Sequence, residues 1–205
     1  MPTPSKRLLL FSDLHADLDQ AQQIVDRSHD FDIAVGAGDF GNLRRQLPET
    51  IEVLRAIHCP VVLVAGNNES TDELRIACRS WKSAHVLHGS GVTIEGVPFW
   101  GLGGGVPTTP FGDWSDDFTE AEAAVLLADC PRNAVLVSHS PPQGVLDRSS
   151  QGKHLGSTAV LAAMQRQAVR LVVCGHIHAS SGQSVQVGNT RVINAGPLGM
   201  EWTLG

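Results

Sequence analysis

Side chains that could bind metal ions follow short apolar segments at several points along this chain. In order they are Asp13, His15, Asp39, Asn67, His139, His176 and His178. Carboxylate, amide and imidazole groups suit divalent ions such as Mn²⁺, Fe²⁺ and Zn²⁺, and the set contains no thiolate. Because these side chains exceed the four ligands of one tetrahedral site, the set favours two divalent metal ions that share a carboxylate.

The spacing of these residues indicates that they meet at one edge of a sheet. Asp13 and Asp39 are 26 residues apart, and Asp39 and Asn67 are 28 apart, each close to one strand–helix–strand repeat. Open α/β sheets bind ligands at the carboxyl ends of their strands. In extended backbone, residues i and i+2 point to the same side, which predicts that His176 and His178 face one place.

Charge arithmetic supports a pair of metal ions at this edge. Two divalent ions would bring four positive charges, of which Asp13 and Asp39 would neutralise two. A residual charge of about +2 would attract a phosphate ester. Without metal ions, two carboxylates and four imidazoles would have no evident reason to converge.

The hydrophobic pattern predicts the elements that would position these residues. The first half alternates apolar strands at 8–12, 31–38 and 61–66 with segments of helical period at 17–28, 47–58 and 71–81. This order predicts a parallel sheet with right-handed crossovers. Short segments at 84–88, 92–95 and 98–102 then predict antiparallel hairpins, followed by a Gly-, Pro- and Thr-rich loop over 103–117. Further helices are expected at 119–128 and 157–168, and strands at 134–138, 171–174, 184–187 and 191–194.

Composition narrows the classes of function. A chain of 205 residues with 42% hydrophobic and 18% charged residues predicts one globular domain over residues 1–205. No apolar segment approaches the roughly 20 residues that cross a bilayer, so we expect no membrane association. The net charge of −6 argues against stable nucleic-acid binding, which needs a basic face. The four cysteines form no C-x-x-C pair, so we expect them reduced and the protein cytoplasmic.

The order of the motifs resembles the calcineurin-like metallophosphoesterase family. The matching blocks are Asp13-x-His15, Gly38-Asp39, Gly66-Asn67, His139 and Gly175-His176-Ile177-His178. Size and the glycine-rich loop are most similar to its small bacterial branch related to Icc-type phosphoesterases. The resemblance implies an α/β fold, a four-layer αββα sandwich with mixed sheets, and two-metal hydrolysis of a small phosphate ester. It also implies that Asp39 bridges two ions, one held by Asp13, His15 and His178 and the other by Asn67, His139 and His176.

Asn68 departs from the family pattern. It stands where the family usually has a histidine that contacts the phosphate and can protonate the leaving group. We therefore expect phosphodiesters, including cyclic nucleotides, as substrates rather than monoesters. Asn68 would donate a hydrogen bond to a phosphoryl oxygen, and His15 would assist leaving-group protonation. We also expect substrate contacts from Gly104, Thr108 and His154.

Other motifs in the sequence are compatible with different kinds of site. Residues 36–41 match the G-x-G-x-x-G dinucleotide fingerprint, but they follow the second strand and would place Asp39 against a pyrophosphate. Cys174 with His176 could suggest a zinc knuckle, although Cys174 is expected to face the core. Ser138, His139 and Asp147 lack the nucleophile elbow of a serine hydrolase. A phosphomonoesterase, or a non-catalytic interaction module of the same fold, stays open, although the complete ligand set favours catalysis. The pattern specifies no oligomeric state.

Overall fold

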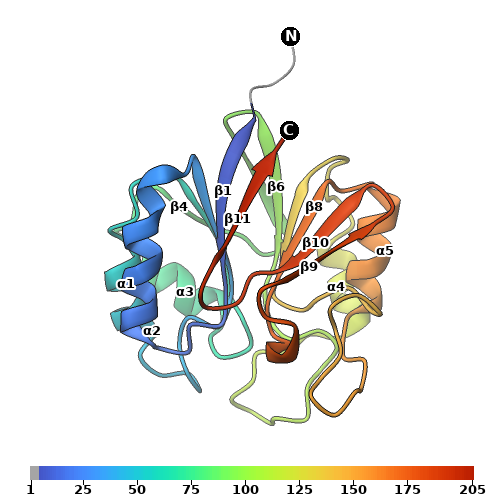
Figure 1. The fold of residues 1–205 in the computed structure, drawn as a ribbon. Coiled ribbons are helices and arrows are strands. Elements are labelled where there is room, and N and C mark those ends of the chain that lie inside the picture. The colour runs from blue at the N-terminus through green and yellow to red at the C-terminus, as the bar shows by residue number, and fades with distance from the viewer. Residues whose placement is uncertain (1–4) are drawn as a thin grey trace.

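Two β-sheets lie face to face between two groups of helices in the computed structural model, which describes residues 5–205 (Figure 1). The first sheet has the order β11 (Met200–Leu204), β1 (Lys6–Phe11), β2 (Ile33–Ala37), β3 (Val61–Val64) and β4 (Ala84–Val86). The second has the order β5 (Ser90–Ile94), β6 (Val97–Leu102), β7 (Val135–Ser138), β8 (Leu171–Cys174), β10 (Thr190–Asn194) and β9 (Gln183–Val187). Helices α1 (Leu18–Arg27), α2 (Leu47–Leu54) and α3 (Thr71–Cys78) cover the first sheet. Helices α4 (Glu120–Leu126) and α5 (Thr158–Arg166) cover the second.

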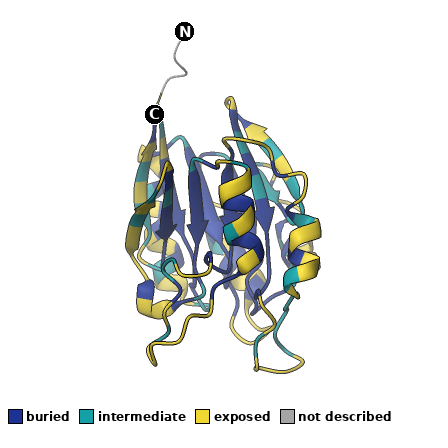
Figure 2. Ribbon diagram, turned by 90° about the vertical axis from the view of Figure 1, so that its right-hand side faces the viewer, coloured by how far each residue is buried: buried dark blue, intermediate teal, exposed yellow. Residues whose placement is uncertain are grey.

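Strand alternation explains the layered core. In β1, Leu8 and Leu10 pack in the core between the sheets, whereas Leu9 and Phe11 pack against the helices. The central strands are buried on both faces, which accounts for their continuous apolar composition, and the helices expose one side to solvent (Figure 2). This arrangement confirms the predicted αββα sandwich. Both sheets are mixed, because β11, β5 and β9 each pair antiparallel with a neighbour.

Side-chain caps set where several helices begin. Ser70 and Glu73 form a reciprocal capping box at the start of α3, and Thr119 and Glu122 form another at the start of α4. The second box lies at the start of the helix predicted over 119–128. Helices α2 and α3 end at Leu54 and Cys78, earlier than their apolar periodicity predicts.

The prediction for residues 84–88 is wrong in its pairing. Rather than forming a hairpin with the next segment, β4 pairs in parallel with β3 and completes the edge of the first sheet. Only β5 and β6 of these three segments pair antiparallel. The reason is that α3 carries the chain back along the sheet, so β4 finds the exposed edge of β3 before the chain crosses to the second sheet.

Strand β11 was not among the strands predicted from the sequence. It pairs antiparallel with β1, and Met200, Trp202 and Leu204 turn toward the core between the sheets while Glu201 stays exposed. This alternation was readable in the sequence. Two smaller 3₁₀ segments complete the described chain, η1 (Ser28–Asp30) and η2 (His178–Ser180). Across residues 5–205, none of the helices has both the length and the apolar character needed to cross a lipid bilayer.

Candidate metal centre

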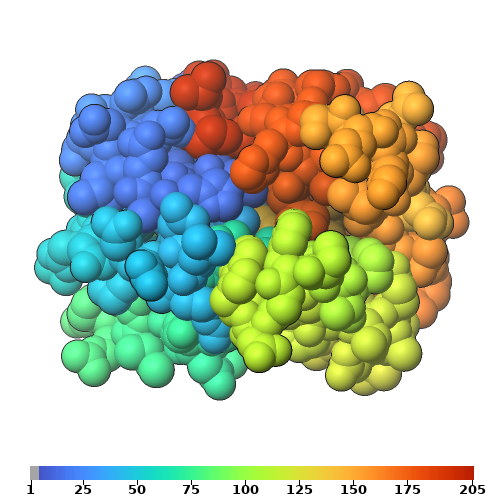
Figure 3. Space-filling model, turned by 90° about the horizontal axis from the view of Figure 1, so that it is seen from below, coloured from blue at the N-terminus to red at the C-terminus, as the bar shows by residue number. Residues whose placement is uncertain are grey.

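The predicted ligand residues lie where the parallel strands end, at the lower edge of both sheets in Figure 1. A cavity of about 630 Å³ opens there, lined in part by His15, Asp39, Asn67, His176 and His178. Figure 3 looks onto this face, where segments from the early, middle and late parts of the chain meet. The common edge predicted from the spacing of the motifs is therefore present.

One group of donor atoms is formed by Asp13, His15 and His178. The Nε2 atoms of His15 and His178 lie 3.0 Å apart, and His178 Nε2 lies 3.8 Å from Asp13 Oδ1. The ligand atoms of the three residues all lie within 4.8 Å of one another. Asp13 is buried, His15 is half-buried and His178 is exposed, so this group faces the opening.

A second group surrounds His139, which is fully buried. His139 Nε2 lies 3.2 Å from Asn67 Oδ1 and 3.4 Å from Asp39 Oδ1. The rings of His139 and His176 meet edge to face with centroids 4.9 Å apart. The two halves of the His-x-His motif thus belong to different groups, because His178 lies beside His15.

Asp39 lies between the two groups and is almost completely buried. Its Oδ2 is 3.7 Å from His15 Nε2, and its Oδ1 is 3.4 Å from His139 Nε2. The carboxylate therefore presents one oxygen to each group. The backbone N–H of Asn68 donates to Oδ1 at 2.9 Å and its side-chain amide donates to Oδ2 at 2.7 Å, which fixes this orientation.

The hydrogen bonds around the second group leave acceptor atoms facing one another. His139 Nδ1 lies 2.8 Å from the carbonyl of Ala37 and donates to it, which directs the Nε2 lone pair toward the carboxylate and the amide oxygen. Asn67 donates from Nδ2 to Ser115 Oγ at 3.0 Å, so its oxygen is the atom turned toward His139. When His139 is neutral, its unprotonated Nε2, the Asn67 oxygen and the Asp39 carboxylate are three acceptors that converge, as the ligands of a cation do. Neighbouring donor atoms about 3–4 Å apart can share an ion that lies roughly 2.0–2.2 Å from each. The residues present therefore fit divalent metal ions.

The ionisation of the cluster points to the same preference for a cation. Burial alone would lower the pKa of His139, but the adjacent Asp39 carboxylate outweighs it and raises that pKa to about 9. Burial would raise the pKa of Asp39, yet the His139 imidazole holds it well below its usual range. Burial and the neighbouring His139 lower the pKa of His176 to about 3. The buried carboxylates thus stabilise positive charge at His139.

The backbone reaches these positions by left-handed turns, which corrects the alternation argument. Asp13, His15, Asp39 and His176 have φ values of 56°, 46°, 58° and 64°. Extended backbone with residues i and i+2 on one side does not describe these segments. Non-glycine residues adopt such conformations at a cost, and they concentrate at functional sites.

Close approach of the backbone to two carboxylates requires glycine. A Cβ atom at Gly66 would lie 2.0 Å from Asp39 Oδ1, and one at Gly175 would lie 2.5 Å from Asp13 Oδ2. Asp13 is held further by Ser12 Oγ, which donates to Oδ2 at 2.6 Å, and by the N–H of His176, which donates to Oδ1 at 3.0 Å. Both glycines precede predicted ligands, which explains the Gly-Asn and Gly-His pairs in the sequence.

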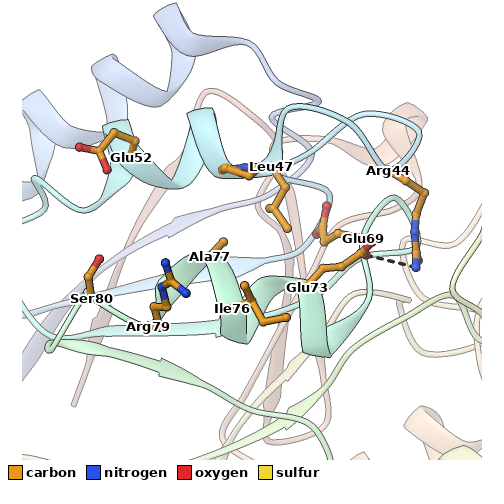
Figure 4. Close-up of a pocket in the computed structure, with 10 residues that line it drawn as sticks. Arg44, Leu47, Glu52, Glu69, Glu73, Ile76, Ala77, Arg79 and Ser80 are labelled. Carbon is orange, nitrogen blue, oxygen red and sulfur yellow. Dashed lines mark ion pairs between the residues drawn. The ribbon is translucent and has the colours of Figure 1, made fainter.

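Glu69 is a buried residue near the site that sequence analysis did not single out. Its carboxylate accepts hydrogen bonds from the N–H groups of Gly66 and Gly41, each at 2.9 Å. Burial and the nearby Asp39 raise its pKa to about 7. It also lines a groove of about 510 Å³ between α2 and α3, where Arg44 pairs with Glu73 (Figure 4). Glu69 therefore links the turns that carry Asp39 and Asn67 through hydrogen bonds. In the sequence, its position directly after Asn67-Asn68 is the feature that could have identified it as part of the site.

The residues expected to contact substrate lie in different surroundings. Asn68 lines the cavity, and its side-chain oxygen accepts a hydrogen bond from Leu43 N at 2.8 Å. Gly104 is buried, where an added Cβ would meet Phe118, and Thr108 is exposed on the following loop. His154 lies beside the main cavity in a smaller one of about 390 Å³, with its Nδ1 2.6 Å from Asp147 Oδ1. Their contacts with substrate stay predictions.

Cys174 is fully buried in the core under α5, and its thiol donates to the carbonyl of Ile193. This placement agrees with the expectation that it faces away from the site.

The sequence pattern of the calcineurin-like phosphoesterase superfamily domain matches residues 7–204. This chain belongs to that superfamily. No curated protein sequence matches it. Similar solved structures include a Thermus thermophilus protein (TM-score 0.76, 17% identity, 95% of this chain and 91% of that one). A phosphopantetheinyl hydrolase from Mycobacterium tuberculosis (TM-score 0.58, 16% identity, 95% and 90%) and a dimetal phosphatase from Danio rerio (0.57, 14%, 92% and 86%) are also similar. These likenesses establish that the calcineurin-like phosphoesterase fold extends over nearly the whole chain.

Proposed function

We propose that this calcineurin-like phosphoesterase hydrolyses small phosphate esters, phosphodiesters in preference to monoesters, with two divalent metal ions. The orientation of Asp39 carries the proposal. Its two oxygens face separate groups of donor atoms, and hydrogen bonds from Asn68 hold them there. A carboxylate that served only one ion would not need this arrangement. The description of the Danio rerio neighbour as a dimetal phosphatase agrees with it.

In this proposal each group of donors holds one ion. Asp13, His15 and His178 would hold the first, Asn67, His139 and His176 would hold the second, and Asp39 would serve both. Bound ions of this kind activate a water molecule for attack on phosphorus and neutralise charge on the phosphoryl oxygens. Imidazole, carboxylate and amide ligands accept Mn²⁺, Fe²⁺ and Zn²⁺.

The protein's own residues position the reacting groups. Ser12, Asn68 and the Ala37 carbonyl orient Asp13, Asp39 and His139, respectively, so that the donor atoms are arranged before an ion arrives. Such prearrangement reduces the reorganisation needed in the transition state.

The preference for diesters rests on Asn68. A carboxamide does not release a proton at neutral pH, and this one is engaged with Asp39 and Leu43. A positioned general acid typically contributes about 10²–10⁴ in rate, most for a basic alkoxide leaving group. Activated or cyclic diesters depend less on such an acid and are the expected substrates. His15, half-buried at the opening, would assist the departing oxygen as a hydrogen-bond donor rather than as an acid, because an imidazole that holds an ion is a poor acid.

The test combines metal analysis with a panel of diesters and monoesters. Wild-type protein should bind two equivalents of Mn²⁺ or Zn²⁺ and hydrolyse bis(p-nitrophenyl) phosphate. Asp39→Ala should lose both ions together and with them the activity, because one oxygen leaves each group. Asp26→Ala, on the exposed face of α1, is the matched control and should keep both. Retention of two equivalents and normal rates in Asp39→Ala would show that Asp39 is not shared.

A further inference from the structure

Two aromatic side chains, Phe111 and Trp114, line the cavity but do not belong to the hydrophobic core. Phe111 and Trp114 lie on the loop between β6 and α4, with ring centroids 5.5 Å apart and ring planes inclined by 14°. Both line the cavity that contains His15 and Asp39. Phe111 is 49% exposed, and neither ring belongs to the three core clusters of the described residues. Their stacking therefore does not serve the packing of the sheets.

The loop that carries the pair is attached directly to the candidate metal centre. The N–H of Asp116 donates to the carbonyl of Asn67, and the side chain of Asn67 donates to Ser115 Oγ, both at 3.0 Å. Ser115 Oγ in turn donates to Asp117 Oδ1 at 3.0 Å, and Thr109 Oγ1 donates to Asp117 Oδ2 at 2.7 Å. The aromatic pair is thereby held in a defined position relative to a residue of the second donor group. Figure 3 shows this loop, in yellow-green, on the same face as the orange segment near residue 150.

Other apolar side chains also line the cavity. Leu43 and Leu155 are 51% and 42% exposed, although both are large apolar residues, and Ile177 lies between the two histidines of the His-x-His motif. All three line the same cavity as the aromatic pair. One part of the cavity is thus polar and suited to a phosphate, and the aromatic pair with these aliphatic side chains makes a large apolar share of the remaining wall.

We propose that the Phe111–Trp114 pair is a binding subsite for a flat aromatic ring of the substrate, either a nucleobase or an aryl group. This inference rests on the proposed function, because the phosphate must lie at the metal centre for the attached ring to reach the pair. Aromatic rings bind to exposed aromatic faces by stacking, whatever their hydrogen-bonding pattern. The subsite would therefore select for an aromatic substituent.

Calorimetric titration of the metal-loaded protein tests the subsite independently of turnover. Methyl phosphate, phenyl phosphate and thymidine 5′-monophosphate are the probes, since they share the phosphate and differ in the ring. Wild-type protein should bind the two aromatic phosphates about tenfold more tightly than methyl phosphate. Phe111→Ala should remove most of this advantage. Phe111→Leu should also remove it, because leucine keeps the apolar surface but not the flat face.

Ile76→Ala is the matched control, since Ile76 is 64% exposed and lines the separate groove between α2 and α3 (Figure 4). It should keep the ratio of the affinities. A further preference for the thymidine compound over phenyl phosphate would identify a nucleobase, and equal affinities would identify an aryl ring. The inference is overturned when methyl phosphate binds as tightly as phenyl phosphate, or when the advantage survives in Phe111→Ala. Ring-dependent binding without hydrolysis of any ester would instead reject the proposed function and leave the subsite standing.

Discussion

Replacement of Gly66 by alanine tests how Asp39 is held between the two donor groups. The new Cβ atom would lie 2.0 Å from Asp39 Oδ1 and 2.3 Å from Asp39 N, well inside the ordinary contact range of 3.4–4 Å. The backbone of Gly66 does not have a positive φ, so alanine meets no conformational penalty there. The whole effect of the substitution therefore comes from the steric conflict with Asp39.

The steric conflict at Gly66 should lower both the stability of the fold and the affinity for metal ions. Insertion of a methyl group into a packed site typically costs about 1–3 kcal/mol. For a domain of this length each kcal/mol lowers Tm by about 2–4 °C, so we expect a decrease of about 2–12 °C. Displacement of a group that positions metal ligands typically weakens binding by about 10–100-fold. Because Asp39 presents an oxygen to each donor group, we expect weaker binding of both ions.

The assay measures thermal unfolding of the metal-free protein and the metal affinity of the folded protein. Gly188→Ala is the control, because Gly188 has a φ of +56° in the turn between β9 and β10 and open space around its Cβ position. It should lose about 1 kcal/mol of stability through backbone strain and bind both ions normally. If Gly66→Ala also binds two ions with wild-type affinity, the Asp39 carboxylate is not confined as argued.

Two further substitutions test separate features. Asn68→His should accelerate hydrolysis of esters with alkoxide leaving groups by up to about 10²-fold, and p-nitrophenyl esters much less, because only the former need a general acid; equal gains would place leaving-group protonation elsewhere. Asp147 is buried, and its pKa, which burial alone would raise, is lowered by its hydrogen bonds to His154 and to the N–H groups of Gly144 and Gly156. Its charged form therefore stabilises the fold above about pH 4 and ceases to do so as the pH falls through its lowered value. Asp147→Asn should lower the free energy of unfolding, measured with urea at pH 7, by about 1–3 kcal/mol. The difference in this free energy from wild type should shrink toward pH 3, and a constant difference would contradict the role of the charge.

Several features of the fold follow from local pattern. The apolar segments that became β1, β2 and β3 are continuous in the sequence, and the helices between them repeat with helical period. Such segments are defined by neighbouring residues, so their type and order were predictable. The position of Asp13, Asp39 and Asn67 at one edge follows in turn, because parallel strands end at the same edge of a sheet.

Pairings between strands that are distant in the sequence were harder to predict. Strand β4 joined β3 rather than β5, and β11 added an antiparallel edge beside β1, at the opposite end of the chain. Both choices depend on which sheet edge is open after the rest of the chain has packed. A short strand carries too little local pattern to specify its partner.

In the candidate metal centre, too, some features follow from the sequence and others depend on the tertiary structure. The sequence alone determined which residues end the strands, and so which types of ligand are available. The family resemblance implied that His176 belongs with His139, that His178 belongs with His15 and that Asp39 lies between them. The tertiary structure supplies the contacts that produce this arrangement. The physical reason is that left-handed turns at the donors, hydrogen bonds from Asn68 to Asp39 and the hydrogen bond from His139 to the Ala37 carbonyl set these directions. The contact of His139 with Ala37 forms only when the two sheets are packed together, because it joins the end of β7 to the end of β2.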